Sequence, residues 1–293
     1  MPPSPSTSIE PIDNQAALLE RMTASQPGVI LIKPRVLLEK LERGSVSPVP
    51  LALHMPPSGL GSVTMIEAAV LVALIRMLEP SCIVEFGTFR GYSTALMVRN
   101  ASLTCRVVSL DLGNLGTAAN GAPVYTAAEL RSDDRKNDDY LRHVQSAEGT
   151  FYLSGLTPQE SQRVTLLHGD SRAFDVTAHQ LDAAVDMVFI DGGHDFATIA
   201  SDTAKALQMA STSSVIVWHD FNSSIHGDVT AFVSGIAADY QILHVQNTML
   251  AILLRGGARD TFCSFGADAS AAAASSRAAT DPQAASGAAA GQT

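Results

Sequence analysis

Carboxylate and imidazole side chains follow the ends of two apolar runs in this sequence. One run is followed by Asp191 and, three positions later, by His194, and the other by His219 and Asp220. Two carboxylates with further ligands suit magnesium or manganese, and a histidine ligand shifts the preference towards manganese, iron or zinc. The sequence therefore predicts a divalent-cation site formed by Asp191, His219 and Asp220, with Asn222 as an alternative to His219.

A mechanism without a metal is the alternative for the same group of residues. Imidazole titrates near neutrality, so His194 is a candidate general base, with Asp191 beside it as the second catalytic residue. Taken one at a time, each of these side chains could equally be a structural hydrogen-bonding, cap or turn residue. Several of them at two neighbouring strand ends favour a functional site.

A glycine turn marks a second candidate site. Glu85 stands in the apolar run 82–86, which is followed by Gly87, Thr88 and, at the start of an expected helix, Gly91. A glycine at position 87 lets a ligand approach backbone that a Cβ would block. The first N–H groups of the helix have no partner within it and can bind an anionic group.

The next apolar run ends in Asp111, whose carboxylate can accept hydrogen bonds from two ribose hydroxyls. With the glycine turn, this is the layout of a nucleoside cofactor site. The spacing from Gly87 to Gly91 differs from the G-x-G-x-x-G dinucleotide fingerprint, and no Lys-Ser/Thr pair of a P-loop follows. A wider turn with an acid beside it suits S-adenosylmethionine, which has an amino acid end and a sulfonium. The alternative is an ordinary strand-turn-helix of a parallel sheet.

Asp170 and Ser171 follow a further apolar run. Either could accept a hydrogen bond from an adenine amino group, and either could cap a helix over 172–180. Both interpretations stay open, because one residue can fill each role.

The apolar runs predict an α/β fold, with a doubly wound, Rossmann-like sheet of seven strands that is mostly parallel and has an antiparallel last strand. The runs are apolar throughout, as expected for parallel strands covered on both faces. Ligands of such sheets bind at the carboxyl ends of the strands. The expected strands span 82–86, 106–110, 163–167, 186–190, 213–218, 241–245 and 249–254, the last two as a hairpin. The expected helices span 14–25, 33–43, 63–78, 91–99, 172–180, 196–210 and 226–238.

Composition suggests how the chain is divided. Residues 1–13 are rich in Pro and Ser, and residues 267–293 in Ala and Ser, so both ends are expected to be disordered. An N-terminal helical extension is expected over 14–80, and the cofactor-binding domain over 81–256. Within that domain, the polar segment 113–162 is either a surface insertion or a lid over the substrate.

Bulk properties narrow the function classes. The chain has 293 residues, of which 46% are hydrophobic, enough for one core domain with appendages. A net charge of −10 without a basic run argues against binding nucleic acid. The longest apolar run is too short to span a bilayer, and the N-terminus does not resemble a secretory signal. The expectation is a cytoplasmic protein that acts on a small molecule, with no membrane partner.

Taken together, the motifs resemble those of the class I S-adenosylmethionine-dependent methyltransferases, in the small-molecule O-methyltransferase branch. The nearest likeness is to a bacterial family similar to catechol-type and macrolide-sugar O-methyltransferases. The segments that carry the resemblance are 84–93, 110–111, 169–171, 191–194 and 218–220.

The resemblance implies a role for each matched residue. Glu85, Gly87 and Ser93 would contact the methionine portion of the cofactor, Asp111 the ribose and Ser171 the adenine. Thr88, Gly91, Asp170 and Asp191 are the further candidate cofactor-binding residues. A metal would sit at Asp191 and Asp220, and His194 would stand where the macrolide-sugar enzymes place a base. In the catechol enzymes an Asn follows the strand-five Asp directly, whereas Phe221 follows Asp220 here.

The resulting hypothesis is methyl transfer from S-adenosylmethionine to a hydroxyl of a small molecule, assisted by Mg²⁺ or Mn²⁺ or by a base alone. An NAD-dependent oxidoreductase or epimerase is the enzymatic alternative. A non-catalytic S-adenosylmethionine-binding scaffold protein is the alternative of another class. A homodimer formed through the N-terminal helices is a further expectation.

Overall fold

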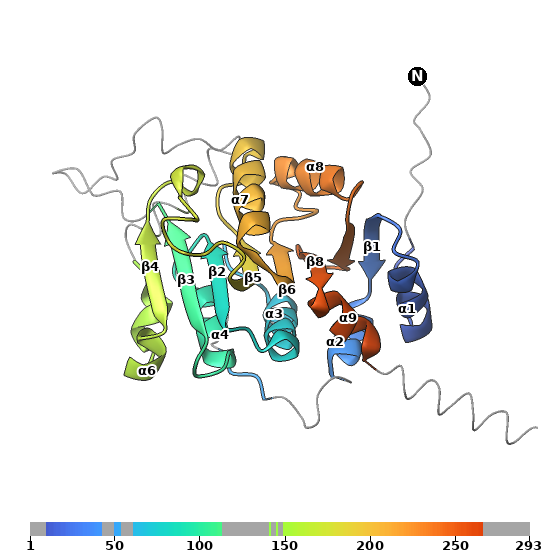
Figure 1. The fold of residues 1–293 in the computed structure, drawn as a ribbon, viewed down its shortest axis with the longest axis horizontal. Coiled ribbons are helices and arrows are strands. Elements are labelled where there is room, and N and C mark those ends of the chain that lie inside the picture. The colour runs from blue at the N-terminus through green and yellow to red at the C-terminus, as the bar shows by residue number, and fades with distance from the viewer. Residues whose placement is uncertain are drawn as a thin grey trace, which may run out of the picture.

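The computed structural model describes residues 10–42, 50–53, 61–112, 141, 145 and 149–265 (Figure 1). The tail predicted at 267–293 lies outside these residues, as do positions 1–9 of the predicted disordered N-terminus and most of the insertion predicted at 113–162. In the described part, no helix is long and apolar enough to cross a membrane.

Eight strands of the described part form one sheet, in the order β1-β7-β8-β6-β5-β2-β3-β4. β8 runs antiparallel to its neighbours β6 and β7, whereas the other paired strands run parallel. The predicted α/β fold, with a mostly parallel sheet and an antiparallel last strand, is confirmed. The strands are β1 (Gly28–Ile32), β2 (Cys82–Phe86), β3 (Arg106–Asp111), β4 (Val164–His168), β5 (Val185–Ile190), β6 (Ala210–Trp218), β7 (Gln241–Val245) and β8 (Ala251–Gly256).

The predicted number of seven strands is wrong, because β1 adds an eighth strand inside the segment 14–80 that was expected to be helical. A five-residue apolar run is too short for periodicity to tell a strand from a piece of buried helix. β1 pairs in parallel with β7, and the Gly28 N–H donates to the Tyr240 carbonyl at 3.0 Å. The N-terminal segment therefore extends the sheet in addition to packing on it.

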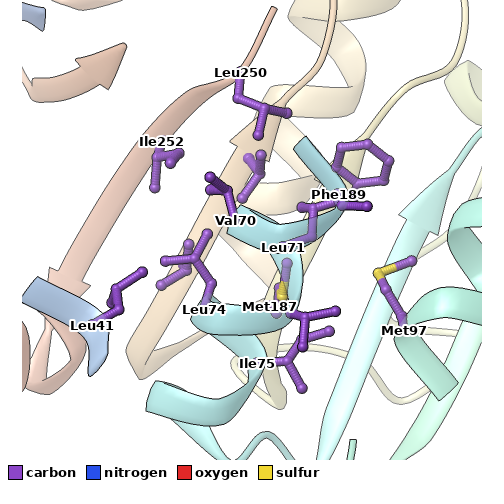
Figure 2. Packing of buried hydrophobic residues seen from close by; sticks show 14 of the residues in the cluster. Leu41, Val70, Leu71, Leu74, Ile75, Met97, Met187, Phe189, Leu250 and Ile252 are labelled. Carbon is purple, nitrogen blue, oxygen red and sulfur yellow. The ribbon is translucent and has the colours of Figure 1, made fainter. Parts of the chain in front are cut away.

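Helices cover both faces of the sheet (Figure 1). Successive residues of β2 face opposite sides of the sheet. Ile83 belongs to the cluster that includes side chains of α1 to α4 and α9, and Val84 to the cluster that includes side chains of α7 and α8. Figure 2 shows Leu71 and Leu74 of α3 in one cluster with Met187 of β5. The helices are α1 (Gln15–Thr23), α2 (Pro34–Glu42), α3 (Met65–Leu78), α4 (Tyr92–Asn100), α6 (Pro158–Ser161), α7 (Phe196–Met209), α8 (Gly227–Ile236) and α9 (Gly257–Ser264), with 3-10 helices η1 (Phe151–Gly155) and η2 (Ser171–Ala173).

The helix predicted over 172–180 is wrong, whereas the other predicted helices and strands lie within a few residues of observed ones. Only the short η2 forms there, and turns follow it. The Asp175 carboxylate accepts the N–H groups of Thr177 and Ala178, each at 3.0 Å. Such local side-chain bonds offer the backbone an alternative to helical hydrogen bonds.

Candidate functional site

A cavity of about 240 Å³ opens at the carboxyl ends of the parallel strands β2 to β6. This is the edge at which α/β sheets bind ligands. Each of these five strand ends contributes at least one lining residue, among them Gly87, Asp111, Asp170, Asp191 and Asp220. The structure thus brings the two candidate sites of the sequence into one cavity.

The glycines of the turn after β2 are required by packing. Gly87 has φ +96°, and a Cβ there would stand 1.9 Å from the carbonyl oxygen of Asp191. Gly91, with φ +79°, opens α4, and a Cβ there would stand 2.5 Å from Cγ of Leu153. Gly87 also lines the cavity. A close contact between the ends of β2 and β5 therefore requires a glycine at position 87, in addition to any need for ligand approach.

Asp111 orders the same turn from the end of β3. Its Oδ2 accepts the backbone N–H of Thr88 at 2.8 Å and that of Phe89 at 2.7 Å. Asp111 also lies on the cavity wall. Binding of a ribose by Asp111 remains a prediction, and the structure adds that this carboxylate holds the turn in shape.

Glu85, Thr88 and Ser93 form a polar network beneath the turn. Glu85 is fully buried, and its Oε2 accepts hydrogen bonds from the hydroxyls of Thr94 and, at 2.6 Å, Ser109. The Thr88 hydroxyl lies 2.6 Å from that of Ser109. Burial raises the pKa of Glu85 to about 7, although hydrogen bonds from Ser109, Ser93 and Thr94 act in the opposite direction.

Four predicted site residues are not among the described residues that line the cavity: Glu85, Thr88, Gly91 and Ser93. Thr88 and Gly91 belong to the turn itself, and Glu85 and Ser93 lie beneath it and support its shape. Cofactor contacts from these four residues remain predictions of the resemblance.

Asp170 and Ser171 line the cavity at the end of β4. Asp170 is the N-cap of η2, because its Oδ1 accepts the backbone N–H of Arg172 at 2.9 Å. The same carboxylate forms an ion pair with the Arg172 guanidinium. Asp170 therefore has the capping role. Ser171 also lines the cavity and does not cap the helix, so it stays the candidate for the adenine contact.

His219 joins the two carboxylates of the strand ends. Its Nδ1 lies 3.0 Å from Oδ1 of Asp191 and 3.0 Å from Oδ2 of Asp220. The prediction that these side chains converge is confirmed. Each offers one donor atom, and the three atoms lie within 4.8 Å of one another, so the set fits a single divalent cation. Asn222 is exposed and is not among the described residues that line the cavity, so its alternative role as a ligand stays a prediction without support from the geometry.

The charges of this cluster depend on one another. Burial alone would lower the pKa of His219, but the carboxylates of Asp191 and Asp220 raise it well above its ordinary value. Burial would raise the pKa of Asp220, but His219 and His194 lower it well below its ordinary value. Burial raises the pKa of Asp191, although His219 acts in the opposite direction. A protonated His219 ring between two carboxylates accounts for the raised pKa of His219 and the lowered pKa of Asp220.

His194 reaches the cluster from the loop after β5. Its Nε2 lies 3.1 Å from Oδ2 of Asp220, and its ring stacks on that of His226 with centroids 3.7 Å apart and planes at 16°. His226 Nε2 lies 4.0 Å from the other oxygen of Asp220. Parallel rings do not direct their in-plane lone pairs to one point. This second group therefore suits proton transfer better than metal binding.

Two residues of the site escaped the sequence analysis. His226 stands just before α8, and no spacing rule connects it with His194. Glu67 stands in the motif Thr64-Met65-Ile66-Glu67, which signals only a capping box at the start of α3. In the fold, Oε2 of Glu67 lies 3.5 Å from Nε2 of His219. Burial would raise the pKa of Glu67, but His219 and backbone hydrogen bonds lower it to about 2.

Comparison with known proteins finds a family model that is similar to the centre of the chain. Residues 84–221 match the model of a family described as a methyltransferase domain. This range starts within β2 and ends just after Asp220, so it contains the glycine turn and the strand-end acids. No curated protein matches the chain.

Solved structures similar to the chain include three methyltransferases. The O-methyltransferase TomG from Streptomyces achromogenes, in complex with SAM, has 19% identity and a TM-score of 0.42, over 67% of this chain and 82% of that one. The SAH-bound Podospora anserina methyltransferase PaMTH1 has 15% identity and a TM-score of 0.46, over 85% and 98%. The O-methyltransferase from Bacillus cereus, in complex with SAH, has 18% identity and a TM-score of 0.41, over 75% and 90%. Similarities this weak do not assign a function.

Proposed function

We propose, from the match of residues 84–221 to the model of a methyltransferase domain, that the chain is an S-adenosylmethionine-dependent O-methyltransferase acting on a hydroxyl group of a small molecule. The observation that carries the proposal is that one cavity contains both halves of such a site. Asp111 and Gly87 line it on the side of the glycine turn, and Asp191, His194 and Asp220 line it at the ends of β5 and β6.

The residues present fit the cofactor because the wall offers acceptors for a nucleoside beside a glycine backbone without side-chain cover. Asp111 would accept from the ribose hydroxyls, and Ser171 or Asp170 from the adenine amino group. Gly87, with Thr88 and Gly91 of the same turn and with Glu85 and Ser93 beneath it, would form the cradle for the methionine portion. When bound, S-adenosylmethionine supplies a methyl group on a sulfonium sulfur, which is activated for displacement by an oxygen nucleophile.

The task left to the protein is to align the acceptor hydroxyl and remove its proton. His194 would take the proton, with Asp191 beside it. Asp220 would orient the imidazole and stabilise its protonated form, as a carboxylate does in a catalytic triad. The 3.1 Å contact between His194 Nε2 and Asp220 Oδ2 supports this pairing.

The proposal further includes a divalent cation that assists the reaction. Asp191, His219 and Asp220 would hold it, and it would lower the pKa of the acceptor hydroxyl. A histidine in the donor set favours Mn²⁺ over Mg²⁺. Activity should fall after dialysis against a chelator and return with Mn²⁺, and full activity of the Asp220→Ala variant in chelator would contradict the metal.

Calorimetry with S-adenosylhomocysteine and with NAD tests the proposal. We expect binding of S-adenosylhomocysteine only, weakened in the Asp111→Ala variant. Absence of heat and of a thermal shift with S-adenosylhomocysteine and S-adenosylmethionine would reject the proposal, and binding of NAD would favour an oxidoreductase or epimerase. Tight cofactor binding with no methylation of a broad hydroxyl library would favour a non-catalytic scaffold protein.

The acceptor class and the assembly belong to the same proposal. A small-molecule acceptor is supported by the position of Asp191 and His194 on the wall of a cavity of about 240 Å³. A homodimer and a cytoplasmic location are proposed from the sequence alone. Light scattering of the purified chain tests the dimer.

A further inference from the structure

Glu67 connects α3 with two segments that line the cavity. It is fully buried near the start of α3. Its Oε2 accepts the backbone N–H of Thr64 at 2.7 Å, and its Oε1 accepts that of Met249, a cavity-lining residue, at 2.7 Å. Its Oε2 also lies 3.5 Å from Nε2 of His219. The carboxylate therefore joins α3 to the β7–β8 connection and to the end of β6.

Capping of α3 does not account for this arrangement by itself. A capping box requires one carboxylate oxygen near the backbone N–H of the N-cap residue. Here the other oxygen holds Met249, and a fully buried carboxylate is costly unless a cation or several hydrogen bonds compensate it. His219 is the side chain nearest to this carboxylate across the fold, because it is itself 5% exposed and lies between Glu67 and the two strand-end aspartates.

We propose that Glu67 is a positioning residue that holds His219 with Nε2 towards α3 and Nδ1 towards Asp191 and Asp220. The orientation matters because Nδ1 is the atom within 3.0 Å of both carboxylates. A carboxylate behind a metal-ligating histidine, the role proposed above for His219, fixes the tautomer and the ring orientation, and losing such a partner typically costs 10- to 100-fold in metal affinity or activity. The inference rests on the proposed function for its consequence in catalysis, but the ring orientation can be measured without an acceptor.

The test uses the full chain with histidine ring nitrogens labelled with ¹⁵N, and the His219 signals assigned with a His219→Asn variant. In the wild type at one neutral pH, we expect a proton on Nε2 of His219 with the downfield shift of a hydrogen bond to a carboxylate. In Glu67→Gln this signal should move upfield or exchange away. Glutamine is also found in capping boxes, so α3 should keep its start.

Thr64→Ala is the matched control, because it removes the hydroxyl that accepts the Glu67 N–H at 3.4 Å and leaves the carboxylate in place. It should lower the thermal midpoint without changing the His219 ring signals. With an acceptor in hand, Glu67→Gln should lower kcat roughly tenfold or more, while affinity for S-adenosylhomocysteine changes by less than about twofold.

A wild-type His219 with no proton on Nε2, or ring signals identical in wild type and Glu67→Gln, would overturn the inference. The wild-type measurement decides the point even if Glu67→Gln does not fold. If the wild type does not bind the cofactor, the proposed function is rejected instead. Failure of the inference about Glu67 and failure of the proposed function can therefore be told apart.

Discussion

Asp220 is the residue on which the histidines of the site converge. His194 Nε2 and His219 Nδ1 lie 3.1 and 3.0 Å from its Oδ2, and His226 Nε2 lies 4.0 Å from its Oδ1. Asp220 also has φ +60°, an uncommon conformation for a residue with a side chain. Backbone in sparsely populated conformations clusters at functional sites, because surrounding contacts maintain it there.

Replacement of the proton-handling residues should separate turnover from cofactor binding. Because a positioned base contributes roughly 10²- to 10⁴-fold, we expect His194→Ala to lower kcat by at least about 100-fold. Asp191→Ala and Asp220→Ala should abolish measurable turnover. Affinity for S-adenosylhomocysteine, measured by calorimetry, should change little in all three variants.

His168→Ala is the control for this series, because His168 is exposed at the end of β4 and does not line the cavity. It should keep wild-type turnover. A His194→Ala variant that is as active as His168→Ala would remove His194 from the mechanism.

At the scale of elements, the site depends on how closely the ends of β2 and β5 approach. Gly87 meets the Asp191 carbonyl, and the Asp191 N–H donates to the Phe86 carbonyl at 2.8 Å. Asp111 then holds the turn from β3. Three neighbouring strands therefore set the position of Asp191, the candidate catalytic residue, relative to the predicted cofactor cradle.

Gly87→Ala should consequently damage both stability and function. A Cβ 1.9 Å from a backbone oxygen forces the strand ends apart, and we expect a loss of roughly 3 kcal/mol or more, in the range of severe overpacking. Gly149→Ala is the control, because Gly149 has φ +59° but no atom within 4 Å of the added Cβ. It should cost only about 1 kcal/mol, the ordinary penalty of a left-handed residue. Equal denaturation midpoints for the two variants would contradict this account.

At the scale of the whole molecule, buried acids make folding stability depend on pH. Burial raises the pKa of Glu85 to about 7, and burial also raises that of Asp202 on α7 to about 7. Between their ordinary pKa values and 7, the folded state binds protons that the unfolded chain has lost. The stabilising contribution is therefore complete below about pH 4 and is lost as the pH rises to 7.

Glu85→Gln should flatten this dependence. For Glu85 alone, a shift from 4.5 to about 7 corresponds to roughly 3 kcal/mol between pH 4.5 and 7. The difference in free energy of unfolding between the glutamine variant and the wild type should therefore favour the variant more at pH 8 than at pH 5. At the higher pH the variant avoids the buried charge that the wild type carries. Urea unfolding at the two pH values measures the difference. If both proteins lose the same free energy of unfolding from pH 5 to pH 8, Glu85 does not carry the effect.

Much of this architecture was predictable because it follows from local patterns. Continuous apolar runs identified seven of the eight strands, and Gly87, Asp111, Asp191 and Asp220 could be placed at strand ends by counting along the chain. The parallel arrangement then implied that these strand ends share one edge of the sheet. The short run of β1 carried no period that could distinguish it from helix, and so it was missed.

The amino-acid sequence by itself determined the order of strands and helices, the glycine turn and the acids and imidazoles that follow the strands. Only the tertiary structure decided that Glu67 faces His219, that His226 stacks on His194 and that Glu85 lies beneath the turn instead of on the cavity wall. The physical reason is that periodicity and capping report the contacts of a residue with its chain neighbours. The partners of a buried charge, such as Met249 for Glu67, come from elements far away in the chain, and packing alone brings them together.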